Sequence, residues 1–354
     1  MKTLVYNLMI ILAMSISLPS YANTEPVTGK HQEKKTITET FDVNADALVS
    51  LKSKFGDMEI RTWDENKVVI VVEIEVEGSN ERKVKDALER IEIDIEGSRS
   101  LVSAKTKFNN PNRGWGNNLS YSVNYTVKMP KSNSLDASND YGSFILNELD
   151  GSSQINCDYG KVIIGKVNHQ DNDINMDYTN NSSIDYIKSA NINADYSDLS
   201  VERAEDIDLN ADYSNIKFEQ VKTLNFNVDY GKVIVGKAGR MIGNSDYTNV
   251  KIAYLISGID LNMDYGGLKI EKLDANFDRL EASVSYTNIK VGIEEESSFD
   301  FDISLSYGDF DYGDGYQIQQ KIKDGSKRKY IGTKGSNAKG KVYIKTSYGD
   351  VDFD

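Results

Sequence analysis

The chain has 354 residues, a formal net charge of −14 at pH 7, one cysteine, two histidines and four prolines. Such an acidic surface argues against binding to nucleic acid or to anionic lipid, where basic patches supply most of the affinity. A single cysteine excludes an internal disulfide, and two isolated histidines argue against a histidine-based zinc site or catalytic triad.

The first residues have the features of a secretory signal peptide. Lys2 precedes an apolar run over residues 8–18, and the small residues in 20–22 fit a cleavage site. This run is shorter than the ~20 apolar residues that a membrane-spanning helix needs. We therefore expect an exported protein, in the periplasm or at the cell surface, without a transmembrane anchor once residues 1–22 are removed. Residues 23–35 are polar and patternless, and we expect a flexible tether there.

Residues 36–130 are predicted to be rich in strands. Apolar and polar residues alternate through most of this segment, as in KVVIVVEIEVEG. The period changes only over about residues 80–91, where apolar residues recur at the spacing of an amphipathic helix. The sequence therefore predicts a strand-rich N-terminal segment that carries one α-helix.

Residues 131–354 contain an internal repeat that centres on a tyrosine. The motif recurs every 17–21 residues, Tyr348 repeats it after a longer interruption, and Phe55 stands in an earlier copy. The regularly spaced copies are centred on Tyr141, Tyr159, Tyr178, Tyr196, Tyr213, Tyr230, Tyr247, Tyr265, Tyr286 and Tyr307. A short period held over ten copies indicates a solenoid, in which each coil stacks on the next.

The apolar positions within each copy predict a parallel β-helix with coils of about 17–21 residues. Counted from the tyrosine, positions −4, −2, +3, +5 and +8 are apolar in most copies, as expected for short strands joined at corners. Strand alternation also places the tyrosine itself inward, and we expect an aromatic stack near a corner. Cys157 stands at position −2, so we expect a small buried residue rather than a nucleophile.

Two polar residues recur at positions that alternation places outside. Asparagine stands at −3 in seven copies, and stacked asparagines can satisfy one another by hydrogen bonds. Aspartate stands at −1, where like charges about 5 Å apart repel. Those aspartates are weak Ca²⁺ candidates: Asp158, Asp177, Asp195, Asp212, Asp229, Asp246 and Asp264.

Turn chemistry is the other explanation for the aspartates, and the sequence favours it. An aspartate at the start of a corner can accept the backbone N–H two residues on. The position becomes serine at Ser285, Ser306 and Ser347, which can make that bond but cannot replace a carboxylate at a calcium site. We therefore expect no metal and no cofactor, with Ca²⁺ kept as the alternative.

Two irregular segments are candidate partner contacts. The loop NNPNRGWGNN carries Arg113 and Trp115, and a basic loop is predicted over residues 321–341. Within that loop Lys327, Arg328 and Lys329 form a run that could clasp an acidic ladder of the same or another molecule. We find no GxSxG, HExxH or P-loop motif, and no copy of the repeat has an added group that would tune two carboxylates apart, so no enzyme is expected.

The whole of residues 36–354 resembles a family of exported bacterial adhesins of unknown activity, which includes the auto-transporter adhesin head GIN domain group. The resemblance rests on FDVNADALVSLKSKFGDMEIRTWDENKVVIVVEIEV, MPKSNSLDASNDYGSFILNELDG and VYIKTSYGDVDFD. It implies a β-solenoid and carries no catalytic residues.

Three functions remain open. The first is a non-enzymatic envelope or surface protein, adhesin-like, that uses a rigid acidic β-helix to bind or scaffold a protein or glycan. The second is a Ca²⁺-stabilised β-helix that binds or processes carbohydrate. The third is a periplasmic sensor or scaffold in an envelope-stress circuit.

Overall fold

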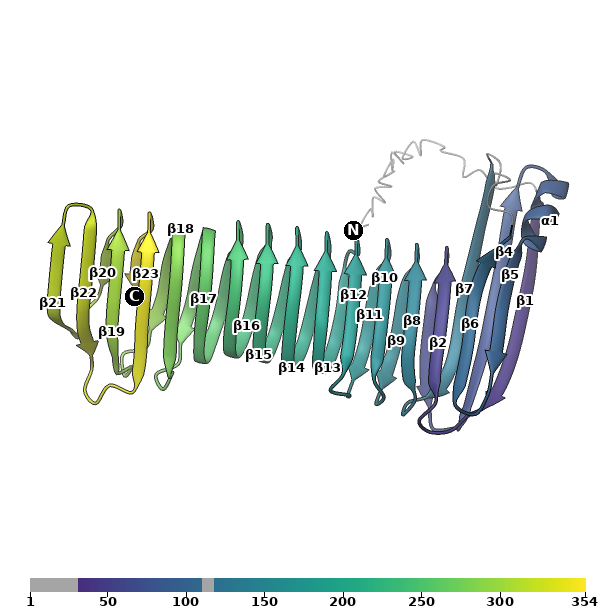
Figure 1. Cartoon of the computed structure of the whole chain (residues 1–354), viewed down its shortest axis with the longest axis horizontal. Helices are drawn as coiled ribbons and strands as arrows, with labels where there is room; N and C mark the ends of the chain where they lie inside the picture. Colours follow the sequence, from purple (N-terminus) through teal and green to yellow (C-terminus); the bar gives the residue numbers. More distant parts are fainter. Residues whose placement is uncertain (1–30, 110–117) are drawn as a thin grey trace, which may run out of the picture.

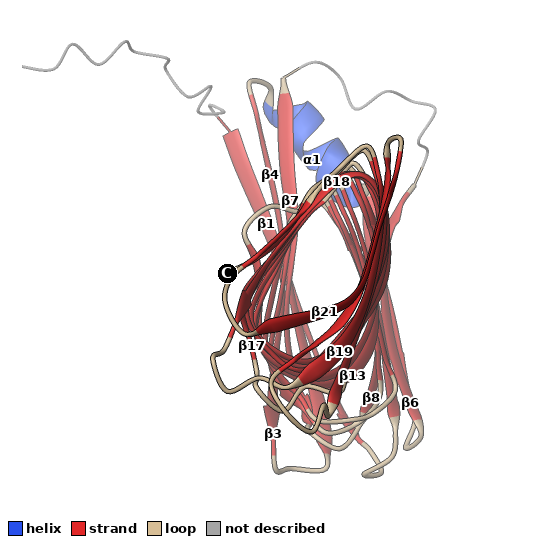
Figure 2. Ribbon diagram, turned by 90° about the vertical axis from the view of Figure 1, so that its left-hand side faces the viewer, coloured by secondary structure: helices blue, strands red, loops and turns tan. Residues whose placement is uncertain are grey.

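The chain forms a long β-solenoid, which confirms the predicted fold class. A computed structural model describes residues 31–109 and 118–354, and these contain 24 strands and one helix (Figure 1). Two mostly parallel sheets lie face to face along the long axis, and the cross-section is a flattened lens (Figure 2). A continuous core of apolar side chains, most of them aliphatic, fills the space between the two sheets.

The N-terminal segment supplies both the first coil and the cover of one end. Strands β2 and β3 pair in parallel with β8 and β9 of the next coil. The remaining strands extend both sheets, with antiparallel pairs β1–β4, β4–β7 and β5–β6. The bounds are β1 His31–Asp42, β2 Leu48–Lys54, β3 Met58–Trp63, β4 Lys67–Gly78, β5 Ile91–Gly97, β6 Leu101–Phe108 and β7 Leu119–Pro130.

Helix α1, Glu81–Glu89, lies where the helical period was predicted. Asn80 caps its N-terminus, since its side-chain oxygen accepts the Lys83 N–H at 3.0 Å. Val84 and Ala87 are buried on its inner face, and the helix contacts β4 and β1. The predicted tether is partly wrong, because residues 31–35 belong to β1, which pairs along its whole length with β4.

The coils of β13 to β16 are each a single long strand that bends to take part in both sheets, whereas the earlier coils are divided into two shorter strands. In β14, residues 198–204 pair in one sheet and residues 206–212 pair in the other, in register with β15. The bounds are β8 Ser134–Asp140, β9 Ser143–Leu149, β10 Ser153–Asp158, β11 Lys161–Val167, β12 Asn172–Asp177, β13 Ser182–Asp195, β14 Asp198–Asp212, β15 Asn215–Asp229, β16 Lys232–Asp246, β17 Asn249–Leu273 and β18 Arg279–Ile293.

The prediction that the tyrosine points inward is wrong. Every motif tyrosine has a positive φ, between 50° and 61°, and its side chain is about half exposed. A left-handed residue interrupts the alternation of a strand, so the phase changes at the tyrosine and the next residue points inward instead. Ser197 and Ser214, for example, are 2% and 1% exposed. The remaining apolar positions are buried as predicted, Cys157 among them.

The last part of the chain does not follow sequence order in space. The remaining bounds are β19 Phe299–Ser306, β20 Phe310–Tyr312, β21 Tyr316–Asp324, β22 Lys327–Lys334, β23 Gly340–Ser347 and β24 Val351–Phe353. Strand β23 lies between β18 and β19, parallel to both, and β24 lies between β18 and β20. The C-terminal coil is therefore inserted before the coil that precedes it in sequence.

The basic loop predicted over residues 321–341 is mostly a hairpin. Strands β21 and β22 pair antiparallel, and β22 pairs antiparallel with β19, so the hairpin extends one sheet beyond the last coil. The sequence pattern missed it because its alternating residues are largely lysine and glutamine rather than apolar.

Candidate functional site: an aromatic ridge along one edge of the solenoid

The motif tyrosines stack into one continuous row, which we call the tyrosine ridge. In spatial order it comprises Phe55, Tyr141, Tyr159, Tyr178, Tyr196, Tyr213, Tyr230, Tyr247, Tyr265, Tyr286, Tyr348 and Tyr307. Neighbouring ring centroids are 4.7–5.1 Å apart and the rings are within 11° of parallel. Eleven such steps make the ridge more than 50 Å long. The predicted stack near a corner is therefore confirmed, although it lies on the outside.

Each ring of the ridge is held in a strained backbone conformation. A left-handed φ costs a non-glycine residue about 1 kcal/mol or more. Stacking between neighbouring rings returns about 0.5–1.5 kcal/mol per pair. Because the two terms are similar, the ridge adds little net stability beyond what asparagine or glycine at the same corner would give.

Buried hydroxyl groups support the corner from below. The residue after the tyrosine is serine, threonine or glycine. Where it is serine or threonine, its hydroxyl links neighbouring coils. Ser214 Oγ accepts the Ser197 N–H at 2.9 Å and donates to the carbonyl oxygen of Ala194 at 2.7 Å. Thr248 repeats the arrangement, accepting the Gly231 N–H and donating to the carbonyl oxygen of Val228.

Stacking determines which parts of the rings can meet a ligand. The ring faces are covered by their neighbours, and a gap below 5.1 Å admits no other group. Only the ring edges and hydroxyl tips are open, and the tyrosines are 46–61% exposed. A sugar therefore cannot stack on a ring face within the ridge, and a partner must meet a narrow ridge of phenol edges.

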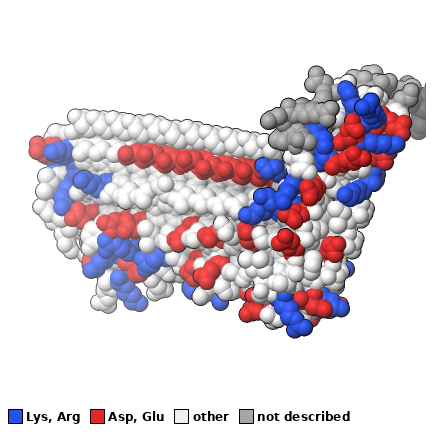
Figure 3. Space-filling view, turned by 45° about the vertical axis from the view of Figure 1, so that its right-hand side comes forward, with Lys and Arg blue, Asp and Glu red and all other residues white. Residues whose placement is uncertain are grey.

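The aspartates form a second row beside the ridge, visible as a continuous red stripe below the upper edge in Figure 3. This aspartate row comprises Asp140, Asp158, Asp177, Asp195, Asp212, Asp229, Asp246 and Asp264. Lys54 makes an ion pair with Asp140 at 2.7 Å, at one end of the row. Among the described residues the other seven carboxylates make no ion pair.

The aspartates support the coil, but not by the predicted turn. The Asp212 N–H donates to Asp195 Oδ1 at 3.0 Å, and the Asp246 N–H donates to Asp229 Oδ1 at 2.9 Å. Each of these bonds joins neighbouring coils, whereas the prediction placed the donor two residues on in the same corner. The left-handed tyrosine accounts for the difference, because the N–H of the next residue is turned inward to a serine or threonine hydroxyl.

Burial and the charges of neighbouring aspartates both raise pKa values within the row. Burial raises the pKa of Asp158, and the charges of Asp177 and Asp140 add to the effect. Burial likewise raises the pKa of Asp177 and of Asp212, with a further contribution from neighbouring aspartates. Beyond Asp140, which pairs with Lys54, the row is therefore a line of negative charge without ion pairs among the described residues.

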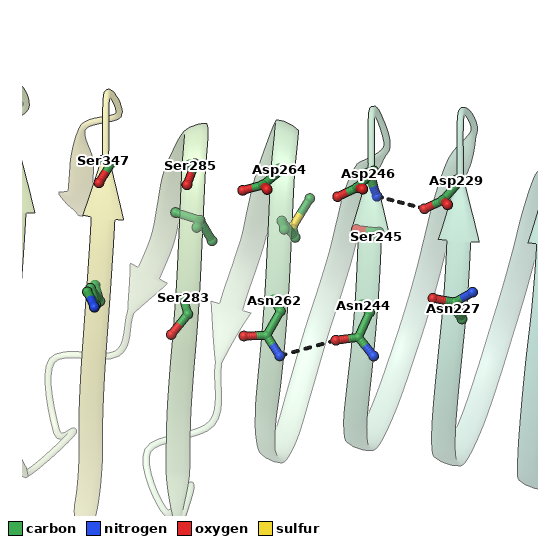
Figure 4. A pocket seen from close by; sticks show the side chains of 13 residues that line it. Asn227, Asp229, Asn244, Ser245, Asp246, Asn262, Asp264, Ser283, Ser285 and Ser347 are labelled. Atoms are coloured by element: carbon green, nitrogen blue, oxygen red, sulfur yellow. Dashed lines mark hydrogen bonds between the residues drawn. The ribbon is translucent and has the colours of Figure 1, made fainter.

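The asparagines form a third row, and their mutual hydrogen bonds confirm the prediction. Asn175 donates to Asn156 at 2.9 Å, and Asn193 donates to Asn175 at 2.7 Å. Figure 4 shows the asparagine and aspartate rows side by side across successive coils. An open groove of about 570 Å³ runs between them, lined by Asn227, Asp229, Asn244, Asp246, Asn262, Asp264, Ser283, Ser285, Lys345 and Ser347, together with Ser245, Met263 and Val284.

The site offers no arrangement typical of a metal centre. Within residues 31–109 and 118–354, no group of three or more histidine, cysteine, aspartate or glutamate side chains could hold a metal ion.

Burial raises the pKa of Cys157 to about 12, which keeps its thiol protonated.

The other candidate contacts lie away from the ridge or outside the described residues. Arg113 and Trp115 fall in 110–117, which the structure does not describe. On β22, Lys329 pairs with Asp302 at 3.1 Å, and Arg328 donates to the carbonyl oxygen of Gly308 at 2.7 Å. Lys327 is exposed on the same strand. Lys329 and Arg328 thus contact the outermost coil, formed by β19 and β20, and not the aspartate row of their own chain.

A flattened β-solenoid with an aromatic ridge along one edge is the class of protein that fold and site define. The chain is similar to solved structures of a putative adhesin from Parabacteroides distasonis (8% identity, 90% of this chain and 97% of that chain, TM-score 0.38) and a putative adhesin from Parabacteroides merdae (12%, 93% and 98%, TM-score 0.31). It is also similar to a putative lipid binding protein from Parabacteroides distasonis (11%, 92% and 98%, TM-score 0.35).

No protein-family model matches the chain. No curated protein matches it either. Helix α1, the one helix of the described residues, has nine residues and is too short to cross a membrane.

Proposed function

We propose that the protein is an exported, non-enzymatic, adhesin-like protein that binds a partner at the cell envelope through the tyrosine ridge. The observation that carries this proposal is the exposure of a strained tyrosine at every coil. Asparagine or glycine would form the same corner with less strain. Strained residues that persist without a stability advantage are typical of functional surfaces.

The size of the ridge supports a macromolecular partner. With about half of each side chain exposed, and 150–250 Å² available per tyrosine, eleven tyrosines present on the order of 1,000 Å². A monomeric protein rarely exposes an apolar patch above a few hundred Å². Each partner in a standard protein interface buries about 800 Å². The ridge alone is therefore large enough for a specific interface.

The aspartate row restricts the chemistry of that partner. An unpaired line of carboxylates repels phosphate-rich and carboxylate-rich polymers, and favours protein or glycan groups that donate hydrogen bonds or carry positive charge. Export follows from residues 1–22, which we expect to be a cleaved signal peptide.

Binding of labelled protein to intact cells tests the role of the ridge. A triple variant replaces three adjacent tyrosines of the ridge by asparagine, which tolerates a positive φ: Tyr196→Asn, Tyr213→Asn and Tyr230→Asn. We expect it to lose at least tenfold in binding. Ile234→Asn with Ile242→Asn removes exposed apolar side chains elsewhere and serves as the matched control. Equal binding by both variants would contradict the proposal.

Protease shaving of intact cells separates the surface function from the periplasmic alternative. Digestion of the protein from outside supports an adhesin-like role. Full protection, with release only after the outer layer is opened, would favour a periplasmic sensor or scaffold.

The calcium alternative has a test of its own. Thermal unfolding with Ca²⁺ and with a chelator should give the same midpoint if the aspartates act in the corner. A calcium-stabilised solenoid would instead be favoured if Ca²⁺ raised the midpoint of the unaltered chain and left the midpoint of the Asp195→Asn, Asp212→Asn double variant unchanged.

A further inference from the structure

The C-terminal coil occupies a slot inside the solenoid. Strand β23 forms seven parallel residue pairs with β18 on one side and eight with β19 on the other. Val342, Ile344, Val351 and Phe353 are at most 2% exposed. Tyr348 stacks on Tyr286 and on Tyr307 at 4.7 Å each. The end of the chain thus fills an internal position of the fold.

A short connection joins this coil to the hairpin that precedes it in sequence. Residues 335–339 link β22 to β23, and Gly335 and Asn337 have positive φ values of 73° and 57°. Lys334 anchors the end of β22, since its Nζ donates to the carbonyl oxygens of Glu294 and Glu295 at 3.2 and 2.9 Å. A change of conformation in residues 335–339 can therefore move the coil out of its slot while the connections before β22 stay unchanged.

The two terminal coils carry nearly the same sequence. Residues 306–312 read SYGDFDY and residues 347–353 read SYGDVDF. Their corners make the same bonds in series: the Asp350 N–H donates to Asn288 Oδ1 at 3.0 Å, and the Asp309 N–H donates to Asp350 Oδ1 at 2.9 Å. The slot beside β18 thus binds a coil of this type through parallel strand pairing and through the hydrogen bond at the corner.

Side-chain size explains why the C-terminal coil is the inner one. The outer coil carries Phe299, Phe301 and Phe310, which pack with Tyr316 of the hairpin and close the end of the core. The inner coil has smaller residues, and Thr346 Oγ1 is buried without a hydrogen-bond partner. The inserted coil therefore brings fewer aromatic side chains to the core than the outer coil does.

We propose that residues 340–354 are exchanged between two copies of this chain, so that each copy fills the slot of the other. The strand pairs, the buried residues and the stacking of Tyr348 are the same whether the coil comes from the same chain or from a partner. Only residues 335–339 change conformation, which makes this exchange an inexpensive route to a dimer. The exchange leaves the tyrosine ridge complete in both copies, so it stands apart from the proposed function.

A cysteine pair in the full chain, without residues 1–22, tests the exchange. Ser304→Cys with Lys345→Cys places two cysteines directly opposite each other on β19 and β23, at outward positions. The protein is refolded at a series of concentrations, oxidised, and run on a denaturing gel without reductant. We expect cross-linked monomer in dilute samples and a cross-linked dimer whose share rises with concentration.

The matched control is Asn244→Cys with Asn262→Cys, which joins two coils that are consecutive in sequence. We expect cross-linked monomer from this pair at every concentration. Monomer alone from the Ser304/Lys345 pair, or equal dimer from both pairs, would overturn the proposal.

Light scattering of the unaltered chain gives a second measurement that needs no substitution. After refolding at the same concentrations, a dimer that persists on dilution supports exchange. A monomer at every concentration refutes it. Deleting residues 336–338 shortens the connection, and we expect it to raise the share of dimer several-fold.

Discussion

At the scale of single residues, the motif tyrosine is the residue whose position sequence reasoning missed. Alternation correctly placed positions −4, −2, +3 and +5 inward, because those residues lie in regular strands. The tyrosine lies in a left-handed corner, and no counting of two-residue periods can detect a change in φ. The signal available was the residue that follows it, which is always glycine, serine or threonine within the repeat.

The left-handed conformation makes a testable prediction at Tyr213, where φ is 54°. Tyr213→Asn loses two stacking contacts but relieves the strain, so we expect a change within about 1 kcal/mol. Tyr213→Val loses the same contacts and adds a β-branched side chain to a left-handed residue, which should cost about 2 kcal/mol more. Denaturant unfolding measures both. Equal stability of the two variants would contradict the assigned conformation.

The buried hydroxyl beneath the corner gives a second prediction. Ser214→Ala leaves the Ser197 N–H without an acceptor in a buried position, and we expect a loss of about 1–3 kcal/mol. Ser214→Thr keeps the hydroxyl, as Thr248 does in its own coil, and should be nearly neutral. Denaturant midpoints compare the two. A loss in the threonine variant as large as in the alanine variant would show that packing, not the hydrogen bond, matters here.

At the scale of elements, the repeat predicted most of the coils. The order of residues along the chain did not predict where the C-terminal coil, formed by β23 and β24, lies in space. Nine spacings of similar length defined the solenoid, since each copy repeats the same buried positions. The longer interval before Tyr348 gave no indication that its coil inserts between two earlier coils. Insertion depends on which coil closes the end of the core, and that is decided by the aromatic cluster around Phe299 and Phe310.

The aspartate row gives the prediction that belongs to this scale. The pKa values of Asp158, Asp177 and Asp212 are raised in the folded state, so the fold binds protons more readily than the unfolded chain. The contribution of these groups to stability therefore falls as pH rises from the unfolded pKa, near 3.9, through the folded pKa.

Replacing these three aspartates by asparagine isolates the effect, because asparagine keeps an acceptor oxygen but carries no charge. We expect the triple variant to be more stable at pH 7, by roughly a few tenths of a kcal/mol per site after allowance for solvent screening. The gain should disappear below about pH 4. Thermal unfolding between pH 3 and 7 measures it, with Asp185→Asn, Glu202→Gln and Asp206→Asn, at exposed sites near the opposite bend, as the charge-matched control. A loss of stability at pH 7 would mean that the carboxylates are compensated.

At the scale of the whole molecule, a solenoid must prevent its open ends from pairing with other chains. The N-terminal end has charged strands at its edges and helix α1 beside them, which lies at that end in Figure 1. At the other end β21 is hydrogen-bonded to β22 on one side only, within the described residues. Lys321 and Lys323 on β21 line an open pocket at that end with Asp309 and Asp352. Charged side chains placed this way oppose strand addition at an edge.

Removing those two charges should convert the end into an association site. In Lys321→Val with Lys323→Val, β21 becomes an apolar, β-branched edge strand with free backbone groups, which is the kind of edge that pairs between molecules. We expect light scattering to show end-to-end oligomers that grow with protein concentration. The control, Lys188→Val with Lys232→Val at exposed sites outside this hairpin, should have the same size as the unaltered chain. Edge pairing is separable from exchange of the C-terminal coil, because it needs no refolding and gives no cross-link between Ser304→Cys and Lys345→Cys of different chains. A double variant that remains unchanged in size would show that the short strand β20 and the twist of the hairpin are enough to protect this end.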